Sequence, residues 1–217
     1  MATISPAVSS PLVTLGDVLA IVAGIPPARI RLLPTPGTGT EVDVVRVRQE
    51  ERKLCELMNG VLVEKAMRTR ESMIACQLIM TLGSFIKQHD LGVIVGEGGM
   101  LRLGPGLIRI PDVSFISWPQ FPGRRLPAEP VWGVHPDLAI EVLSETNTEA
   151  EMTRKLREYF ASGTRLVWIV DPRTETVTVY PSLVPATEAG RLGRGELLQG
   201  AEVLPGFTLA VDAVFDL

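Results

Sequence analysis

The sequence predicts an α/β (α+β) fold, a mixed sandwich of strands and helices, and three observations lead to this prediction. Residues 70–88 repeat apolar side chains at helical spacing, and residues 148–160 form a second helical pattern. Between these helices, residues 137–143 are almost entirely apolar, as in a strand that is buried on both faces. Helices that alternate with such strands favour a sheet with helices packed against it.

The chain of 217 residues, of which 46% are hydrophobic and 21% charged, is long enough for one domain with a real core and an extension. Its formal net charge of −4 gives no overall positive field, so a nucleic-acid partner would need a local basic patch. Neither Cys55 nor Cys76 belongs to a CxxC pair, and we expect both to be reduced thiols in a cytoplasmic protein. No stretch resembles a signal peptide or a membrane span, so no membrane partner is expected.

Residues 1–40 are expected to form an N-terminal helical arm and a connector, with the compact domain over residues 41–217. Within the arm, residues 15–23 (LGDVLAIVA) predict a short helix that ends at Gly24. Residues 31–40 contain two prolines and two glycines, which exclude a continuing helix and indicate a turn-rich connector.

The first half of the domain is expected to hold a hairpin, a helix and two strands. An Asn-Gly pair lies between two alternating apolar runs within residues 54–64, which is a strong hairpin signal. The helix over residues 70–88 follows, and two strands are predicted over residues 92–103 and 107–116, separated by a Gly-Pro-Gly turn. The apolar stripe of the helix consists of Ile74, Leu78, Leu82 and Phe85.

The second half begins with a proline-rich loop and the apolar strand over residues 137–143. Asn147 or Thr148 can cap the next helix, which is expected to run to about Phe160. Strands over residues 165–170 and 176–180 then form a second hairpin, and a Pro-Gly-Phe turn near the C-terminus precedes an edge strand.

Several common types of site are absent from the sequence. It contains no phosphate-binding GxxxxGK[ST] loop, no complete dinucleotide-binding glycine motif and no GxSxG nucleophile elbow. It has two histidines and no Cys/His set at zinc spacing. His89 is expected at the solvated end of a helix and His135 in a loop, so we do not expect histidine-based catalysis.

Two acidic residues interrupt strands that are otherwise predicted to be buried. In residues 137–143 (DLAIEVL), Glu141 shares a face with apolar neighbours, and Asp112 does the same within residues 107–116. An ionised carboxylate in a sheet core is costly unless a cation or strong hydrogen bonds compensate it. Two such groups either share a proton or hold a cation between them, and carboxylate oxygens suit Mg²⁺.

The helix that follows Glu141 offers a basic group to this pair. On a helical wheel Lys155 lies at the edge of the apolar stripe, so its ammonium can point inward. Two carboxylates that hold Mg²⁺ and an ammonium near the bound water form a constellation for phosphodiester hydrolysis. Four other charged residues are expected on the outer side of the helix: Glu151, Arg154, Arg157 and Glu158.

A purely structural interpretation of these residues is also open. Asp112 could close a turn with Pro111, and Glu141 could lie at a strand end within reach of solvent or of Arg109. Lys155 could be an ordinary surface lysine. Each residue taken singly fits this interpretation, whereas the three together, on two strands and the next helix, favour one shared site.

Four linked motifs resemble the Uma family of putative restriction endonucleases, part of the PD-(D/E)XK nuclease superfamily. They follow one another in the family's order, and with the ELMNG hairpin at residues 56–60 the similarity covers roughly residues 41–217. The motifs are Ile110-Pro111-Asp112-Val113-Ser114-Phe115, Pro136-Asp137-Leu138-Ala139-Ile140-Glu141-Val142-Leu143-Ser144, Lys155 with Glu158-Tyr159-Phe160, and Val167-Trp168-Ile169-Val170-Asp171-Pro172.

The resemblance implies a restriction-endonuclease-like mixed sheet flanked by helices and a metal-dependent endonuclease that hydrolyses DNA. It implies that Asp112 and Glu141 bind Mg²⁺, for which Mn²⁺ can substitute, and that Lys155 assists the attacking water. The superfamily's usual lysine, two residues after the glutamate, is replaced here by Leu143. A lysine on the following helix is typical of the Uma family.

Two further carboxylates are candidates for an auxiliary role, Glu56 by its place in the hairpin motif and Glu71 by its place at the start of a helix. For Glu71 the simpler role is a charge that stabilises the helix N-terminus. By analogy with the superfamily, in which a double-strand cut needs two sites, we expect a homodimer.

An acidic protein that binds DNA needs basic groups near its site. Residues 101–125 carry four arginines and one aspartate, and Arg124-Arg125 could form a clamp on the DNA backbone or a solvated loop pair. An alternative function is a non-catalytic nuclease-fold module that binds nucleic acid or protein. A third is a structural homodimer with Trp118 and Trp132 at its interface, although core packing is the ordinary role of tryptophan.

Overall fold

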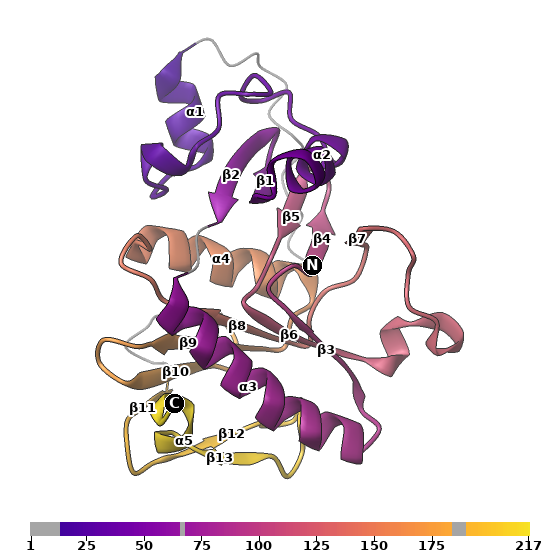
Figure 1. The fold of residues 1–217 in the computed structure, drawn as a ribbon, viewed down its shortest axis with the longest axis vertical. Helices are drawn as coiled ribbons and strands as arrows, with labels where there is room; N and C mark the ends of the chain where they lie inside the picture. The colour runs from indigo at the N-terminus through magenta and orange to yellow at the C-terminus, as the bar shows by residue number, and fades with distance from the viewer. Residues whose placement is uncertain (1–13, 66–67, 184–189) are drawn as a thin grey trace.

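The computed structural model describes residues 14–65, 68–183 and 190–217, and it confirms the mixed α/β prediction (Figure 1). Its larger sheet has six strands in the order β11 (Gly190–Leu192), β10 (Thr176–Tyr180), β9 (Leu166–Asp171), β8 (Leu138–Val142), β6 (Val113–Ser117) and β3 (Gly92–Gly96). The sheet is mixed, because β8 and β9 are parallel and the other neighbours are antiparallel.

A second sheet has five strands in the order β2 (Val61–Lys65), β1 (Leu54–Met58), β5 (Leu107–Arg109), β4 (Met100–Gly104) and β7 (Val131–Trp132). The predicted hairpin is confirmed, since β1 and β2 pair around Asn59 and Gly60. Both turn residues have positive φ, 46° and 79°, which is the geometry that an Asn-Gly turn provides.

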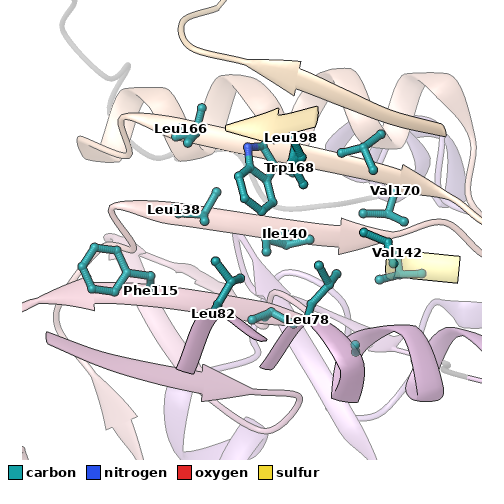
Figure 2. Packing of buried hydrophobic residues seen from close by; sticks show 14 of the residues in the cluster. Leu78, Leu82, Phe115, Leu138, Ile140, Val142, Leu166, Trp168, Val170 and Leu198 are labelled. Atoms are coloured by element: carbon teal, nitrogen blue, oxygen red, sulfur yellow. The ribbon is translucent and has the colours of Figure 1, made fainter. Parts of the chain in front are cut away.

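Helices cover both faces of the six-stranded sheet. On one face lie α3 (Thr69–Gln88) and the C-terminal segment, which contains β12 (Leu197–Gln199), β13 (Thr208–Ala210) and α5 (Asp212–Phe215). Leu78 and Leu82 of α3 belong to the hydrophobic core on this face. Figure 2 shows them facing core residues of the strands, among them Ile140 of β8. On the other face lies α4 (Glu149–Ser162), which packs on the sheet together with residues of β4.

Local signals set the ends of α4. The Thr148 hydroxyl accepts a hydrogen bond from the Glu151 N–H at 3.1 Å, so Thr148 rather than Asn147 is the N-cap. The Asn147 side chain accepts from the Ser144 N–H instead, at 2.8 Å. Gly163 follows the helix with φ of 108°, a conformation that glycine adopts without strain.

The prediction of two long strands, over residues 92–103 and 107–116, is wrong in one respect. Each of these segments forms two shorter strands with a break between them. The first is interrupted at residues 97–99, where Gly98 has φ of 135°. The second is interrupted at residues 110–112, where Pro111 has no N–H for a strand ladder. At both breaks the chain passes from one sheet to the other, so Asp112 lies at a crossing and not inside a strand.

The N-terminal segment packs on the hairpin. The predicted helix is α1 (Leu15–Ile21), followed by a 3-10 turn, Pro27–Arg29. Val18, Val22 and Ile25 are buried against hairpin residues, and the Arg31 N–H donates to the Leu62 carbonyl at 2.9 Å. The hairpin residues of this contact are Met58, Val61 and Val63.

Two helices were not expected from the sequence: α5, near the C-terminus, and α2 (Glu41–Glu51), which begins at a capping box between Thr40 and Asp43. Two other short 3-10 turns, Trp118–Gln120 and Pro122–Arg124, shape the proline-rich loop. In the described ranges, none of the helices has both the length and the apolar character that a membrane crossing requires.

Candidate active site

The three residues singled out from the sequence meet at one place between the two sheets and α4. Glu141 lies on β8, Asp112 directly before β6 and Lys155 on α4, and they are 4%, 3% and 3% exposed. The Lys155 Nζ donates to Glu141 Oε2 at 2.8 Å. The Tyr159 hydroxyl donates to the other carboxylate oxygen, Oε1, so both oxygens of Glu141 are fixed in direction.

Asp112 is held beside Glu141 by hydrogen bonds to β8, the strand on which Glu141 lies. Its backbone N–H donates to the Ile140 carbonyl at 3.0 Å, and its Oδ2 accepts from the Val142 N–H at 2.6 Å. These bonds attach Asp112 to the residues on either side of Glu141. The two carboxylates therefore form one unit whose spacing is set by β8.

Lys65, the last residue of β2, is a site residue that the sequence reasoning missed. Its Nζ lies 2.7 Å from Asp112 Oδ1 and 3.9 Å from Glu141 Oε2, and it donates to the Ile110 carbonyl. Burial alone would lower the pKa of Lys65, but the charges of Asp112 and Glu141 outweigh burial and raise it above its ordinary value. The available signal was a lysine on the same strand face as Val61 and Val63, which are buried.

A second layer of charges stands behind Lys155. Glu56 of β1 is 1% exposed, and its Oε1 lies 3.5 Å from Lys155 Nζ. Arg109 is fully buried and donates to Glu56 Oε2 at 2.6 Å. Burial favours a higher pKa for Glu56, but Lys155 and Arg109 outweigh it and hold that pKa well below its usual range. Glu56 is thus linked to Glu141 by Lys155, which contacts both carboxylates.

Glu71, on the first turn of α3, also faces the site. It is 8% exposed and its Oε2 is buried without a hydrogen-bond partner in the described part of the chain. It lines a small cavity of about 20 Å³, enough for about one water-sized particle. The cavity is lined by Arg29, Lys65, Glu71, Asp112, Glu141, Val142, Asn147 and Lys155.

The donor set of this cavity fits a hard divalent cation. Asp112, Glu141 and Glu71 supply carboxylate oxygens, and a buried carboxylate oxygen without a partner is costly unless a cation approaches it. Across the described residues, however, no three His, Cys, Asp or Glu side chains already converge on a common point as ligands do. The ammonium of Lys65 lies among the carboxylates instead.

Glu151 was predicted on the outer side of α4, and this prediction is wrong. It is 0% exposed, because the N-terminal segment covers the first turn of α4. Arg29 makes two hydrogen bonds to its carboxylate, both of 2.9 Å, and donates a third to the Glu64 carbonyl at 2.9 Å. A helical wheel cannot reveal this contact, because the covering residue comes from a segment far away in the sequence.

The basic patch expected over residues 101–125 is largely engaged within the protein. Arg102 makes two hydrogen bonds to Glu41, and the buried Arg109 is bound by Glu56 and Glu158. Arg124 lies 2.7 Å from Asp90 and over the Trp118 ring. Arg109 thus has a buried intramolecular role. Arg124 and its neighbour Arg125 are exposed, so a clamp on the DNA backbone at this pair stays a prediction.

The histidines and cysteines lie away from these groups. His89 is exposed at the end of α3 and contacts the Phe85 carbonyl through Nδ1 at 2.9 Å, as expected for a helix end. His135 lies against Gly163 after α4. Cys55 is buried and Cys76 exposed, and both are free thiols.

Comparisons with known proteins agree with this architecture. The Uma2 family, described as "Putative restriction endonuclease", matches residues 41–212. The chain is also similar to a crystal structure of "a putative nuclease belonging to DUF820 from Anabaena variabilis", with a TM-score of 0.65 and 21% identity over 75% of this chain and 90% of that chain. No match was found among curated proteins.

The matched residues span most of the chain and include every carboxylate and lysine of the site described above. The structural similarity adds a shared fold, with mixed sheets flanked by helices. The family match supports a nuclease function. The chain therefore belongs to the Uma2 family.

Proposed function

We propose that this protein is a metal-dependent endonuclease that hydrolyses phosphodiester bonds of DNA, with Asp112 and Glu141 as ligands of Mg²⁺ or Mn²⁺. The observation that carries the proposal is the convergence of these two buried carboxylates with Lys155 in one small cavity. A bound divalent ion would stabilise charge on the scissile phosphate and make water a better nucleophile.

The protein's own residues supply orientation. Tyr159 and Lys155 each donate to one oxygen of Glu141, and the Val142 N–H fixes Asp112. Preorganised ligands of this kind need little rearrangement before reaction. Lys155 carries three N–H donors, and its contacts to Glu141 and Glu56 leave capacity for a water or phosphate oxygen.

Glu71 is a further carboxylate for the ion. Its buried Oε2 lacks a hydrogen-bond partner among the described residues and lines the same cavity as Asp112 and Glu141. This supports a ligand role in addition to the favourable position of a negative charge in the first turn of α3.

The test is cleavage of supercoiled, linear, single-stranded and branched DNA, and of RNA, with Mg²⁺ or Mn²⁺. Glu141→Gln should lower the cleavage rate by at least about 100-fold, since it removes a ligand charge while keeping the shape of the side chain. Glu202→Gln, at an exposed position in the C-terminal segment, is the matched control and should cut at the wild-type rate. Wild-type protein that cuts none of these substrates, or a Glu141→Gln variant that cuts equally well, would refute the proposal.

One observation favours the second candidate, a non-catalytic nuclease-fold module that binds nucleic acid or protein. Lys65 already compensates the carboxylates, and the remaining cavity is small. Binding of DNA without cleavage in any metal, measured by fluorescence anisotropy on the same substrates, would support that function instead.

A further inference from the structure

Lys65 occupies the position that a cation between Asp112 and Glu141 would take. Its ammonium contacts Asp112 Oδ1 at 2.7 Å, lies 3.9 Å from Glu141 Oε2 and donates to the Ile110 carbonyl. Three oxygens from three different residues therefore surround it, two of them ionised. This is the type of oxygen environment that Mg²⁺ and Mn²⁺ prefer.

We infer that Lys65 is a built-in counter-cation, which holds the carboxylate pair together in the metal-free protein and which a divalent ion must displace in order to bind. The inference rests on the proposed function and adds a form of regulation to it. Metal affinity would then be set by competition with a side chain of the protein, and not by the carboxylates alone.

The charges around the site separate the roles of the two lysines. Lys155 lies between Glu141 and Glu56, whereas Lys65 is the ammonium that contacts Asp112. Removal of Lys65 would leave Asp112 and Glu141 facing each other without that cation. Their mutual repulsion would destabilise the metal-free protein and favour the binding of an external cation.

The available space supports displacement over sharing. The small cavity of about 20 Å³ has room for about one water-sized particle, and Lys65 itself lines it. A divalent ion within reach of both carboxylates would lie against the Lys65 ammonium, at a strongly repulsive distance for two cations. The lysine stem has four flexible carbons, so the ammonium can withdraw without movement of the strand.

Isothermal titration calorimetry with Mn²⁺ and thermal unfolding in EDTA test this inference on the full chain. Lys65→Met should lower the melting temperature in EDTA and should bind Mn²⁺ at least about tenfold more tightly than the wild type. Lys53→Met is the matched control, since Lys53 is a half-exposed lysine at the start of the same hairpin, and its Mn²⁺ affinity should equal that of the wild type.

A second variant keeps the test decisive if Lys65→Met does not fold. Lys65→Arg retains the charge and enlarges the head group, so it should bind Mn²⁺ no more tightly than the wild type. Mn²⁺ affinity that is unchanged or weaker in Lys65→Met, tighter in Lys65→Arg, or absent from wild type and variants alike would overturn the inference.

Cleavage assays separate this inference from the proposed function. If the wild type cuts DNA and Lys65→Met shows unchanged Mn²⁺ affinity, the inference fails and the nuclease function stands. If Lys65→Met binds Mn²⁺ more tightly but neither protein cuts any substrate, the competition stands and the nuclease function fails.

Discussion

The buried pair of Arg29 and Glu151 gives a quantitative prediction for the N-terminal segment. Glu151 is 0% exposed, and Arg29 binds both of its oxygens at 2.9 Å. Arg29→Met would leave a buried carboxylate with Asn147 as its remaining side-chain donor, at 3.1 Å. Breaking such a pair from one side costs about 3–5 kcal/mol of unfolding free energy. For a chain of this size, that corresponds to a melting temperature lower by about 6–20 °C.

Urea unfolding followed by tryptophan fluorescence measures this loss, because Trp168 is fully buried in the core. The double variant Arg29→Met/Glu151→Met removes the orphaned charge and should recover most of the stability. Arg46→Met, which breaks an exposed ion pair with Asp43, is the control and should change stability by less than about 1 kcal/mol. A loss below about 1 kcal/mol for Arg29→Met, with the N-terminal segment as resistant to trypsin as in the wild type, would refute the reasoning.

Three other predictions concern single residues. Burial raises the pKa of the Cys55 thiol to about 11, so at pH 8 that thiol is protonated. Iodoacetamide should therefore label Cys76 alone in the native protein, and two adducts in the intact mass would contradict this. Gly24→Ala should destabilise the protein by about 1–3 kcal/mol in urea unfolding, because Gly24 has φ of 85° and its added Cβ would lie 2.6 Å from the Ala150 Cβ. Unchanged stability would argue against close docking of the N-terminal segment on α4. Glu71→Gln should raise the melting temperature in EDTA and reduce the additional rise caused by Mn²⁺, whereas an equal Mn²⁺ response in both proteins would exclude Glu71 as a ligand.

The sequence predicted those elements whose signal is local. The Asn59-Gly60 turn, the apolar stripe of α3 and a cap of α4 at Asn147 or Thr148 depend on residues within a few positions of one another. All three are confirmed, the cap being Thr148. The breaks at residues 97–99 and 110–112 were missed because the strands on either side are equally apolar. Periodicity records that a strand is buried, but not which of two sheets buries it.

Long-range contacts explain what was missed at the site. The positions of Asp112, Glu141 and Lys155 followed from motifs, whereas Lys65 comes from a hairpin about 50 residues before Asp112 and reaches the site through sheet packing. Burial of Glu151 likewise depends on Arg29, 122 positions away. Local patterns carry no information about such partners, so the helical wheel placed Glu151 on the outer side of the helix.

The charged residues of the site are anchored in two different sheets. Asp112 is bound to Ile140 and Val142, and therefore travels with Glu141 and the six-stranded sheet. Lys65 belongs to the edge strand of the five-stranded sheet. The ion pair between Lys65 and Asp112 therefore also joins the two sheets, and its loss would weaken the contact between them at this point.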